Sequence, residues 1–287
     1  MNRYQILTDS SADLPLSLLG QYNVDVVQLS VALEGEDPRP NNEVEPASFY
    51  ATLRDKRDVK TSAANAALFT EQFEAYLAKG QDVLYLGFSS GLSATYQASR
   101  VAAEELREKY PQRTVFTVDT LCAALGQGLL VYLVAKKAAE GATIEEARDY
   151  AEALKLNLAH WFTVNDLFFL KRGGRVGTAT AVVGTMLQIK PVMHVDDAGH
   201  LVKVTTARGR KGSLDALLGK MKESVLDRPD QTVFIGHGDC LEDAQYLAGK
   251  IKAELDIEVQ LIDYVGPVIG AHSGPGTVAL FFLGKER

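Results

Sequence analysis

Hydroxyl and carboxylate side chains follow the ends of several predicted strands in this chain. In open α/β sheets, ligands bind beyond the carboxyl ends of the strands, and hydroxyls together with helix N-terminal N–H groups hold small anions. Each such residue taken alone is more often a helix cap, so it is the repetition that indicates an anion site. The set comprises Thr8, Asp9, Ser10, Ser11, Ser89, Ser90, Gly91, Ser93, Asp119, Thr120, His237 and Asp239. Thr61 and Ser62 are expected to open a helix instead.

A different chemistry is indicated by G-F-S-S-G at residues 87–91. The stretch matches G-x-S-x-G, the nucleophile elbow of α/β hydrolases, in which a serine lies between a strand and a helix. Ser89 would be the nucleophile and His272 the base. Asp239 or Asp263 would complete the triad. No HGGG-type oxyanion loop precedes the motif, so a serine hydrolase is the alternative rather than the leading function.

Two glycine-rich segments carry the remaining polar chemistry. Residues 171–175 read Lys-Arg-Gly-Gly-Arg, in which Arg172 and Arg175 can pair with a carboxylate or a phosphate. Residues 270–276 form the densest glycine cluster and are expected to present His272 at the tip of a loop. The plainer interpretations are a solvated turn for the first segment and a structural loop for the second.

Motifs for nucleotides and metals are absent from the sequence. No G-x-x-x-x-G-K-[ST] occurs, and no G-x-G-x-x-G follows the first predicted strand. There is no H-E-x-x-H or EF-hand loop, and the five histidines lack metal-ligand spacing. Cys122 and Cys240 lie far apart and form no C-x-x-C pair. The sequence therefore predicts no cofactor and no metal site.

Composition and charge limit the kinds of partner that the protein is expected to bind. The 287 residues carry 30 Lys and Arg against 37 Asp and Glu, a net charge of −7. Such a chain lacks the clustered positive charge that broad nucleic-acid binding requires. No apolar run approaches the roughly 18 residues of a membrane span, and no apolar stretch follows Arg3 as it would in a signal peptide. We expect a cytoplasmic protein with no nucleic-acid partner and no stable membrane insertion.

Strands and helices alternate along almost the whole chain. The predicted strands include residues 3–10, 24–33, 82–90, 114–120, 161–165 and 232–239, with a hairpin over 192–209. The predicted helices include residues 46–56, 60–80, 93–110, 125–141 and 143–158. This pattern predicts an α/β protein with an N-terminal parallel sheet covered by helices over residues 1–159. A C-terminal mixed α/β domain is expected over residues 160–287.

Seven segments in order make the sequence resemble the DegV family over essentially its whole length. They are ILTDSSADLP (6–15), KTSAANAALF (60–69), SSGLSATYQAS (89–99), VDTLCAALGQGLLV (118–131), FFLKRGGRVG (168–177), IKPVMHVDDAGHL (189–201) and GPVIGAHSGPGTVALFF (266–282). Residues 63–64 read Ala-Ala where the family usually has Gln-Pro, and Ala94 stands where it usually has Gly. Both departures alter the surroundings of a headgroup site but leave Thr61, Ser62 and Ser93 in place.

The resemblance implies a two-domain protein that holds one long-chain fatty acid in a buried apolar tunnel between its domains. In the family, a separate ATP-dependent kinase subunit phosphorylates the carboxylate to an acyl phosphate, so this chain would be a lipid-binding subunit and not an enzyme alone. The matching carboxylate-binding positions are Thr61, Ser62, Ser93 and His272. Arg172 and Arg175 are the candidates for partner docking or phosphate contact. A kinase of small hydroxylated molecules, by fold analogy with dihydroxyacetone kinases, is a third interpretation.

Overall fold

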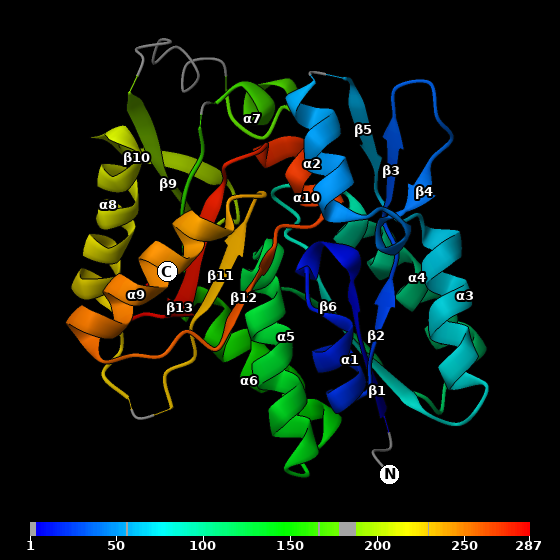
Figure 1. Cartoon of the computed structure of the whole chain (residues 1–287). Helices are drawn as coiled ribbons and strands as arrows, with labels where there is room; N and C mark the ends of the chain where they lie inside the picture. Colours follow the sequence, from blue (N-terminus) through cyan, green and yellow to red (C-terminus); the bar gives the residue numbers. More distant parts are fainter. Residues whose placement is uncertain (1–3, 56, 166, 178–187, 229) are drawn as a thin grey trace.

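The strands and helices form two α/β halves that lie side by side (Figure 1). The computed structural model describes residues 4–55, 57–165, 167–177, 188–228 and 230–287. The strands are β1 (Tyr4–Asp9), β2 (Val24–Val27), β3 (Ser30–Leu33), β4 (Arg39–Pro40), β5 (Val59–Ser62), β6 (Asp82–Gly87), β7 (Val115–Asp119), β8 (Leu158–Thr163), β9 (Ile189–Val195), β10 (Leu201–Arg208), β11 (Phe234–His237), β12 (Leu261–Tyr264) and β13 (Val278–Leu283). The helices are α1 (Leu16–Tyr22), α2 (Pro46–Arg54), α3 (Ala66–Leu77), α4 (Thr95–Lys109), α5 (Ala124–Ala139), α6 (Ile144–Leu154), α7 (Phe168–Arg172), α8 (Gly209–Ser224), α9 (Leu241–Leu255) and α10 (Pro267–Ser273).

The first half is built on a four-stranded parallel sheet with the order β2-β1-β6-β7. Every residue of β1 is buried, as expected for a strand that helices cover on both faces. On one face Leu7 and Tyr85 pack with Phe69 of α3. On the other face, alternate residues of the same strands pack on α5. The predicted helix-covered parallel sheet is confirmed.

The second half is a six-stranded mixed sheet with the order β10-β9-β8-β13-β11-β12. Only β11 and β12 run parallel in it, and the other neighbours are antiparallel. Helices α8 and α9 cover one face, where Leu217 and Leu247 pack against Leu280 of β13. The predicted mixed α/β arrangement is confirmed, including the hairpin formed by β9 and β10.

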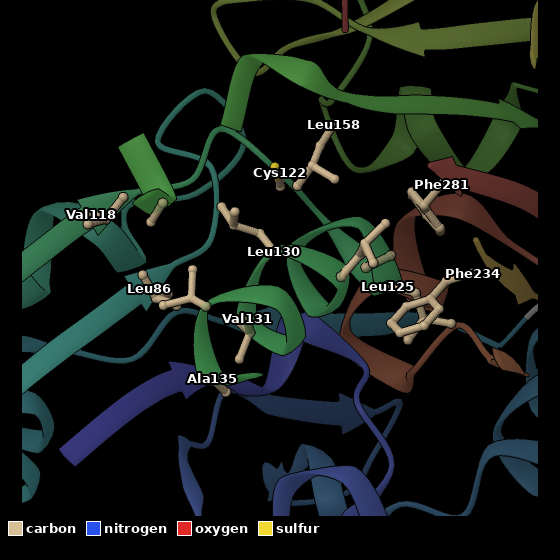
Figure 2. Packing of buried hydrophobic residues seen from close by; sticks show 14 of the residues in the cluster. Leu86, Val118, Cys122, Leu125, Leu130, Val131, Ala135, Leu158, Phe234 and Phe281 are labelled. Carbon is tan, nitrogen blue, oxygen red and sulfur yellow. The ribbon is translucent and has the colours of Figure 1, made fainter. Parts of the chain in front are cut away.

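Helix α5 lies between the two sheets and contributes to one continuous apolar core (Figure 2). Its residue Leu125 packs beside Phe234 and Phe281 of the mixed sheet. One and a half turns further on, Val131 lies near Leu86 of the parallel sheet. The two halves are therefore joined by shared packing as well as by the chain.

The predicted single strand over residues 24–33 is wrong, because the run divides between two sheets. Its first part is β2, which pairs with β1 in the parallel sheet. The chain then turns at Leu29, whose N–H donates to Ser10 Oγ at 2.9 Å. The second part is β3, the middle strand of a three-stranded antiparallel sheet with the order β4-β3-β5. Both parts are apolar, so hydropathy alone does not reveal the break.

The boundary between the halves was predicted after residue 159, which falls inside β8. The predicted helix over residues 143–158 is also too long, because α6 ends at Leu154 and β8 begins at Leu158. The division into residues 1–159 and 160–287 stays a proposal. Within the described parts of the chain, no helix is long and apolar enough to cross a membrane.

Candidate functional site

A cavity of about 270 Å³ lies where residues of both halves meet. Its walls are largely apolar, and its volume is close to the lower end of the roughly 300–1,000 Å³ of small-molecule sites. The apolar lining residues are Leu29, Ala63, Phe88, Leu92, Ala94, Ala123, Ala124, Phe162, Leu170, Val195, Leu201, Val265, Val268, Ile269, Ala279 and Phe281. Such a lining suits an apolar ligand with a small polar group.

Strand alternation builds the mixed-sheet wall of this cavity. Thr277, Ala279 and Phe281 follow at intervals of two along the chain entering β13, and all three line the cavity. Because successive side chains of a strand point to opposite faces, Leu280 packs instead against the α8 and α9 side. The four residue-to-residue steps from Thr277 to Phe281 span about 13 Å, which gives the cavity an elongated wall.

Several polar side chains also line the cavity. All four residues predicted to bind a carboxylate line it, namely Thr61, Ser62, Ser93 and His272. Thr61 Oγ1 and His272 Nε2 are 2.8 Å apart and hydrogen-bonded. Ser93 Oγ lies 2.9 Å from Thr95 Oγ1 and accepts the Thr95 N–H at 3.2 Å, at the start of α4. These groups come from β5, the loop before α4, and α10, which are far apart in the sequence.

Thr61 and Ser62 do not open a helix as the sequence predicted. They belong to β5, where Thr61 pairs with Val31 and Ser62 with Ser30 of β3. Helix α3 begins only after Asn65, whose Oδ1 accepts the N–H of Leu68 at 2.9 Å. The cap therefore lies three residues further along the chain, and the antiparallel ladder fixes the backbone of β5 beside α10.

His272 lies in helix α10 and not at the tip of a loop, which corrects the sequence-based expectation. Pro267 opens this helix, and Gly270 lets it approach Tyr50, whose hydroxyl oxygen would lie 2.5 Å from an added Cβ. Burial, together with the positive charges of Arg175 and Arg172, lowers the pKa of His272 to about 4. The imidazole is therefore neutral near pH 7, and it hydrogen-bonds a carboxylate without forming an ion pair.

The two arginines of the cationic segment have different surroundings. Arg175 lines the cavity, and its Nε donates to the carbonyl of Leu92 at 3.2 Å. Burial lowers the pKa of this guanidinium. Arg172 does not line the cavity, and it forms an ion pair with Asp58 at 3.3 Å. Arg175 is therefore the arginine of this segment that lines the cavity, whereas Arg172 lies outside the lining and pairs with the exposed carboxylate of Asp58.

Ser89 has a different role from the one that the G-x-S-x-G match suggests. Its side chain is buried, and its Oγ donates to the carbonyl of Gly199 at 2.9 Å. His272 Nε2 is paired with Thr61, and Asp239 forms an ion pair with Arg54. Asp263 accepts the N–H of Tyr264 at 2.7 Å. Ser89 and His272 are thus each bonded to other groups and not to each other, so they do not form the pair that a triad needs.

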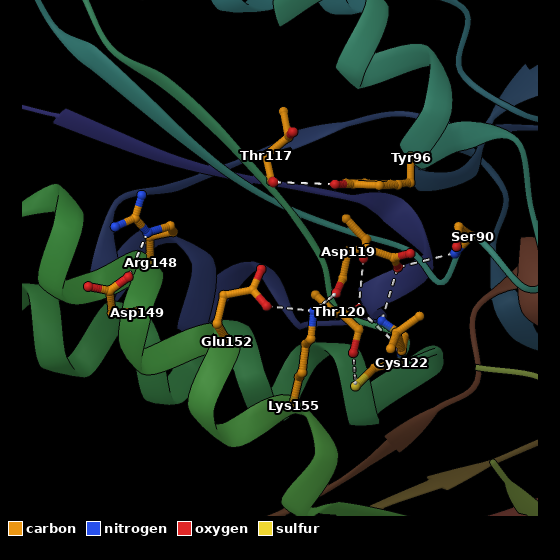
Figure 3. A network of polar contacts seen from close by, with 12 residues as sticks. Ser90, Tyr96, Thr117, Asp119, Thr120, Cys122, Arg148, Asp149, Glu152 and Lys155 are labelled. Atoms are coloured by element: carbon orange, nitrogen blue, oxygen red, sulfur yellow. Dashed lines mark hydrogen bonds and ion pairs between the residues drawn. The ribbon is translucent and has the colours of Figure 1, made fainter. Parts of the chain in front are cut away.

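Several strand-end residues hold loops in place. Asp9 accepts hydrogen bonds from the N–H of Phe88 at 2.9 Å and from the Tyr85 hydroxyl at 2.5 Å. Asp119 accepts the N–H of Ser90 at 3.2 Å (Figure 3). Thr120 Oγ1 donates to the carbonyl of Gly87 at 2.7 Å. These bonds fix the loop that follows β6, which carries Ser93. The strand ends therefore position the site even where they do not line it.

Sequence reasoning missed His160, a buried residue of β8 that lines the cavity. Its Nδ1 lies 2.8 Å from the carbonyl of Leu158, and burial lowers its pKa well below the ordinary value. The alternation that turns Phe162 toward the cavity also turns His160 there. That period of two is the signal that would have found it. Among the residues that the structure describes, no cluster of three or more His, Cys, Asp or Glu side chains is arranged to hold a metal ion.

Comparison with known sequences identifies the family. A family model described as "Uncharacterised protein, DegV family" matches residues 3–285. A DegV domain-containing protein of Clostridium perfringens is 43% identical over 289 residues, which covers 100% of this chain and 99% of that protein. The chain belongs to the DegV family.

Solved DegV structures share the architecture described above. One from Thermus thermophilus, described as a fatty-acid-binding DegV family protein, is 31% identical with a TM-score of 0.86, and the match covers 98% of this chain and 99% of that one. A DegV lipid-binding protein from Thermotoga maritima is 30% identical with a TM-score of 0.84 and full coverage of both chains. These two DegV proteins thus bind a fatty acid and a lipid, respectively, and neither supports a serine hydrolase.

Proposed function

We propose that this protein binds one long-chain fatty acid in the cavity between its halves and presents the carboxylate to a separate ATP-dependent kinase subunit. The observation that carries the first part is a largely apolar cavity whose lining also includes the hydroxyl and imidazole groups of Thr61, Ser93 and His272. The fatty acids bound by DegV relatives have this division into an apolar chain and a small polar head.

The apolar walls supply most of the affinity. A sixteen-carbon chain has about 14 methylenes, and at ~0.8 kcal/mol each their burial gives on the order of 11 kcal/mol before the costs of binding. The polar groups then fix the orientation of the head. Since His272 is neutral near pH 7, Arg175 is the positive charge available to the carboxylate from the cavity wall.

The kinase partnership rests on chemistry that the chain lacks. Forming an acyl phosphate requires a carboxylate oxygen to attack the terminal phosphorus of ATP while ADP leaves, and this needs groups that hold Mg²⁺ and the nucleotide phosphates. The sequence has no P-loop. We assign nucleotide binding to the partner, and we assign Arg172, which lies outside the cavity lining, to partner or phosphate contact. A partner of this kind places the protein in the cytoplasm, where ATP is available.

Native mass spectrometry of the purified protein tests fatty-acid binding. We expect a stoichiometric added mass of a few hundred daltons that organic solvent releases as fatty acid. Ligand-free protein that also fails to take up added palmitate would contradict the proposal. For the alternative, a fluorophosphonate probe that labels Ser89 would support a hydrolase, and we expect no labelling.

A further inference from the structure

The G-F-S-S-G motif takes part in a contact between the two halves. We define the serine loop as residues 87–93 and the hairpin turn as residues 196–200, between β9 and β10. The Oγ of Ser89 in the serine loop donates to the carbonyl of Gly199 in the hairpin turn at 2.9 Å. Gly91 also meets this turn, because an added Cβ there would lie 2.8 Å from the carbonyl oxygen of Ala198. Only a residue without a Cβ allows the two backbones to approach this closely.

This contact lies against the wall of the cavity. Phe88 and Leu92 of the serine loop line the cavity, and so do Val195 and Leu201, which flank the hairpin turn. Phe88, Leu92 and Leu201 also belong to one small apolar cluster. The Ser89–Gly199 hydrogen bond therefore joins two segments whose neighbouring side chains form one part of the wall.

A second and more open hollow of about 360 Å³ lies on the other side of this part of the wall. Leu92, Arg175 and Leu201 line both hollows. They therefore form the partition between the cavity and the surface. Separation of the serine loop from the hairpin turn would part Leu92 from Leu201 and connect the two hollows.

Each segment has anchors apart from the Ser89–Gly199 hydrogen bond. Arg287 ties the start of the hairpin turn to the first half, because its Nη1 donates to the carbonyls of Asp196 at 3.1 Å and Leu121 at 2.6 Å. Asp119 anchors the serine loop through the N–H of Ser90 (Figure 3). In the hairpin turn, Asp196 Oδ1 accepts the N–H groups of Ala198 at 3.0 Å and His200 at 2.8 Å. Neither segment needs to unfold when the two separate.

We infer that the serine loop and the hairpin turn form a clasp that gates the fatty-acid cavity, with Ser89 as the side chain that fastens it. The inference rests on the proposed function, because it concerns the passage of the same ligand. In this inference, Ser89 of the G-x-S-x-G match controls how fast the cavity opens and is not a nucleophile. Loss of the Ser89–Gly199 hydrogen bond lowers the barrier to separating the two segments, and it leaves the residues that contact the ligand unchanged.

The test is the rate at which bound palmitate exchanges with deuterated palmitate, followed by native mass spectrometry of the full-length protein. We expect exchange in Ser89→Ala to be about threefold to tenfold faster than in wild type, the effect of losing the Ser89–Gly199 hydrogen bond. The variant also loses the bond that Ser89 Oγ accepts from the Gly91 N–H at 3.2 Å, which lies within the serine loop. The equilibrium affinity should be unchanged, because entry and exit accelerate together. Gly91→Ala places a Cβ between the serine loop and the hairpin turn, so its bound palmitate should also exchange faster. Ser90→Ala is the matched control, since only its backbone N–H is used.

Wild-type exchange rates in both Ser89→Ala and Gly91→Ala would overturn the clasp, as would a loss of affinity without faster exchange. If wild-type protein binds no palmitate, the proposed function fails, and hydrogen–deuterium exchange of the ligand-free protein decides the clasp by itself. Faster amide exchange in residues 196–200 of Gly91→Ala than of Ser90→Ala would support it. Equal exchange in the two variants would refute it.

Discussion

At the scale of single residues, the polar part of the site depends on hydrogen bonds more than on charge. Thr61 and His272 are directly bonded, and the neutral imidazole leaves Arg175 as the cation on the cavity wall. The residue types and family spacing predicted Thr61, Ser62, Ser93 and His272 as one set, and the structure places all four on one cavity. What the sequence could not provide was the hydrogen-bonded pair, because its members are 211 residues apart.

Removal of a head-binding side chain should weaken retention without unfolding the protein. We expect Ser93→Ala and His272→Ala each to reduce palmitate affinity by about threefold to tenfold, the net effect of a lost hydrogen bond. Isothermal titration of delipidated protein measures this, with Thr205→Ala on the exposed part of β10 as the control. Wild-type affinity and wild-type acyl phosphate formation in both variants would remove these residues from the site.

The lowered pKa of His272 predicts a pH dependence of stability. The folded pKa of about 4 lies below the roughly 6.5 of an unfolded histidine, so between these values the unfolded chain binds the extra proton. The free energy of unfolding should therefore fall as the pH falls from 6.5 to 4, by at most about 3 kcal/mol from this group. Urea unfolding at several pH values should show a shallower dependence for His272→Gln than for wild type. Parallel curves would contradict the assignment.

At the scale of elements, hydropathy periodicity predicted most helices and strands because their buried faces are regular. Helix α4 lies within the predicted helix over residues 93–110, and β9 and β10 form the hairpin predicted over residues 192–209. The strand failures share one cause, which is pairing with a distant strand. β5 is a strand because it pairs with β3, and its own residues carry no local signal strong enough to reveal it. The residues of β3 were predicted as strand, but nothing local separates them from β2.

The start of α3 can be tested directly, because the structure and the sequence-based prediction place it at different residues. If Asn65 caps the helix, Asn65→Ala should lower the free energy of unfolding by about 1 kcal/mol. Ser62→Ala should change it by less than about 0.5 kcal/mol, since Ser62 is exposed in β5. Urea denaturation midpoints compare the two variants. A larger effect at Ser62 than at Asn65 would restore the helix start that the sequence suggested.

At the scale of the whole molecule, the sequence predicted two α/β halves but not how they are joined. The join is made by α5, which packs on Leu86 of one sheet and on Phe234 and Phe281 of the other. Nothing in the α5 sequence identifies its second partner, because an apolar helix face is compatible with any apolar surface. The cavity itself is a product of this join, since its lining comes from both halves.

The shared core predicts a single unfolding transition. The only tryptophan, Trp161, reports on the mixed sheet, while far-UV circular dichroism reports on both halves. We expect the two signals to give the same urea midpoint, because neither half keeps its core when the other unfolds. Two separate midpoints would show that residues 1–159 and 160–287 unfold independently.

The contrast between the two arginines predicts separate effects on binding and on coupling to a partner. Arg172→Ala should leave palmitate affinity unchanged, because Arg172 does not line the cavity, yet reduce acyl phosphate formation by the cognate kinase subunit at least tenfold. Arg175→Ala should reduce both, since Arg175 lines the cavity. A loss of palmitate from Arg172→Ala would show that its role is in binding.

The position of the Ser89–Gly199 hydrogen bond, against the cavity wall but outside the cavity, separates residence time from selectivity. The side chains that line the cavity decide which fatty acids fit. The Ser89–Gly199 hydrogen bond does not contact the fatty acid, yet it decides how long the fatty acid stays bound. Substitutions in the serine loop or hairpin turn can therefore tune how long a carrier retains its cargo between encounters without changing which cargo it prefers. A slow carrier and a fast carrier of the same lipid need differ only at this clasp.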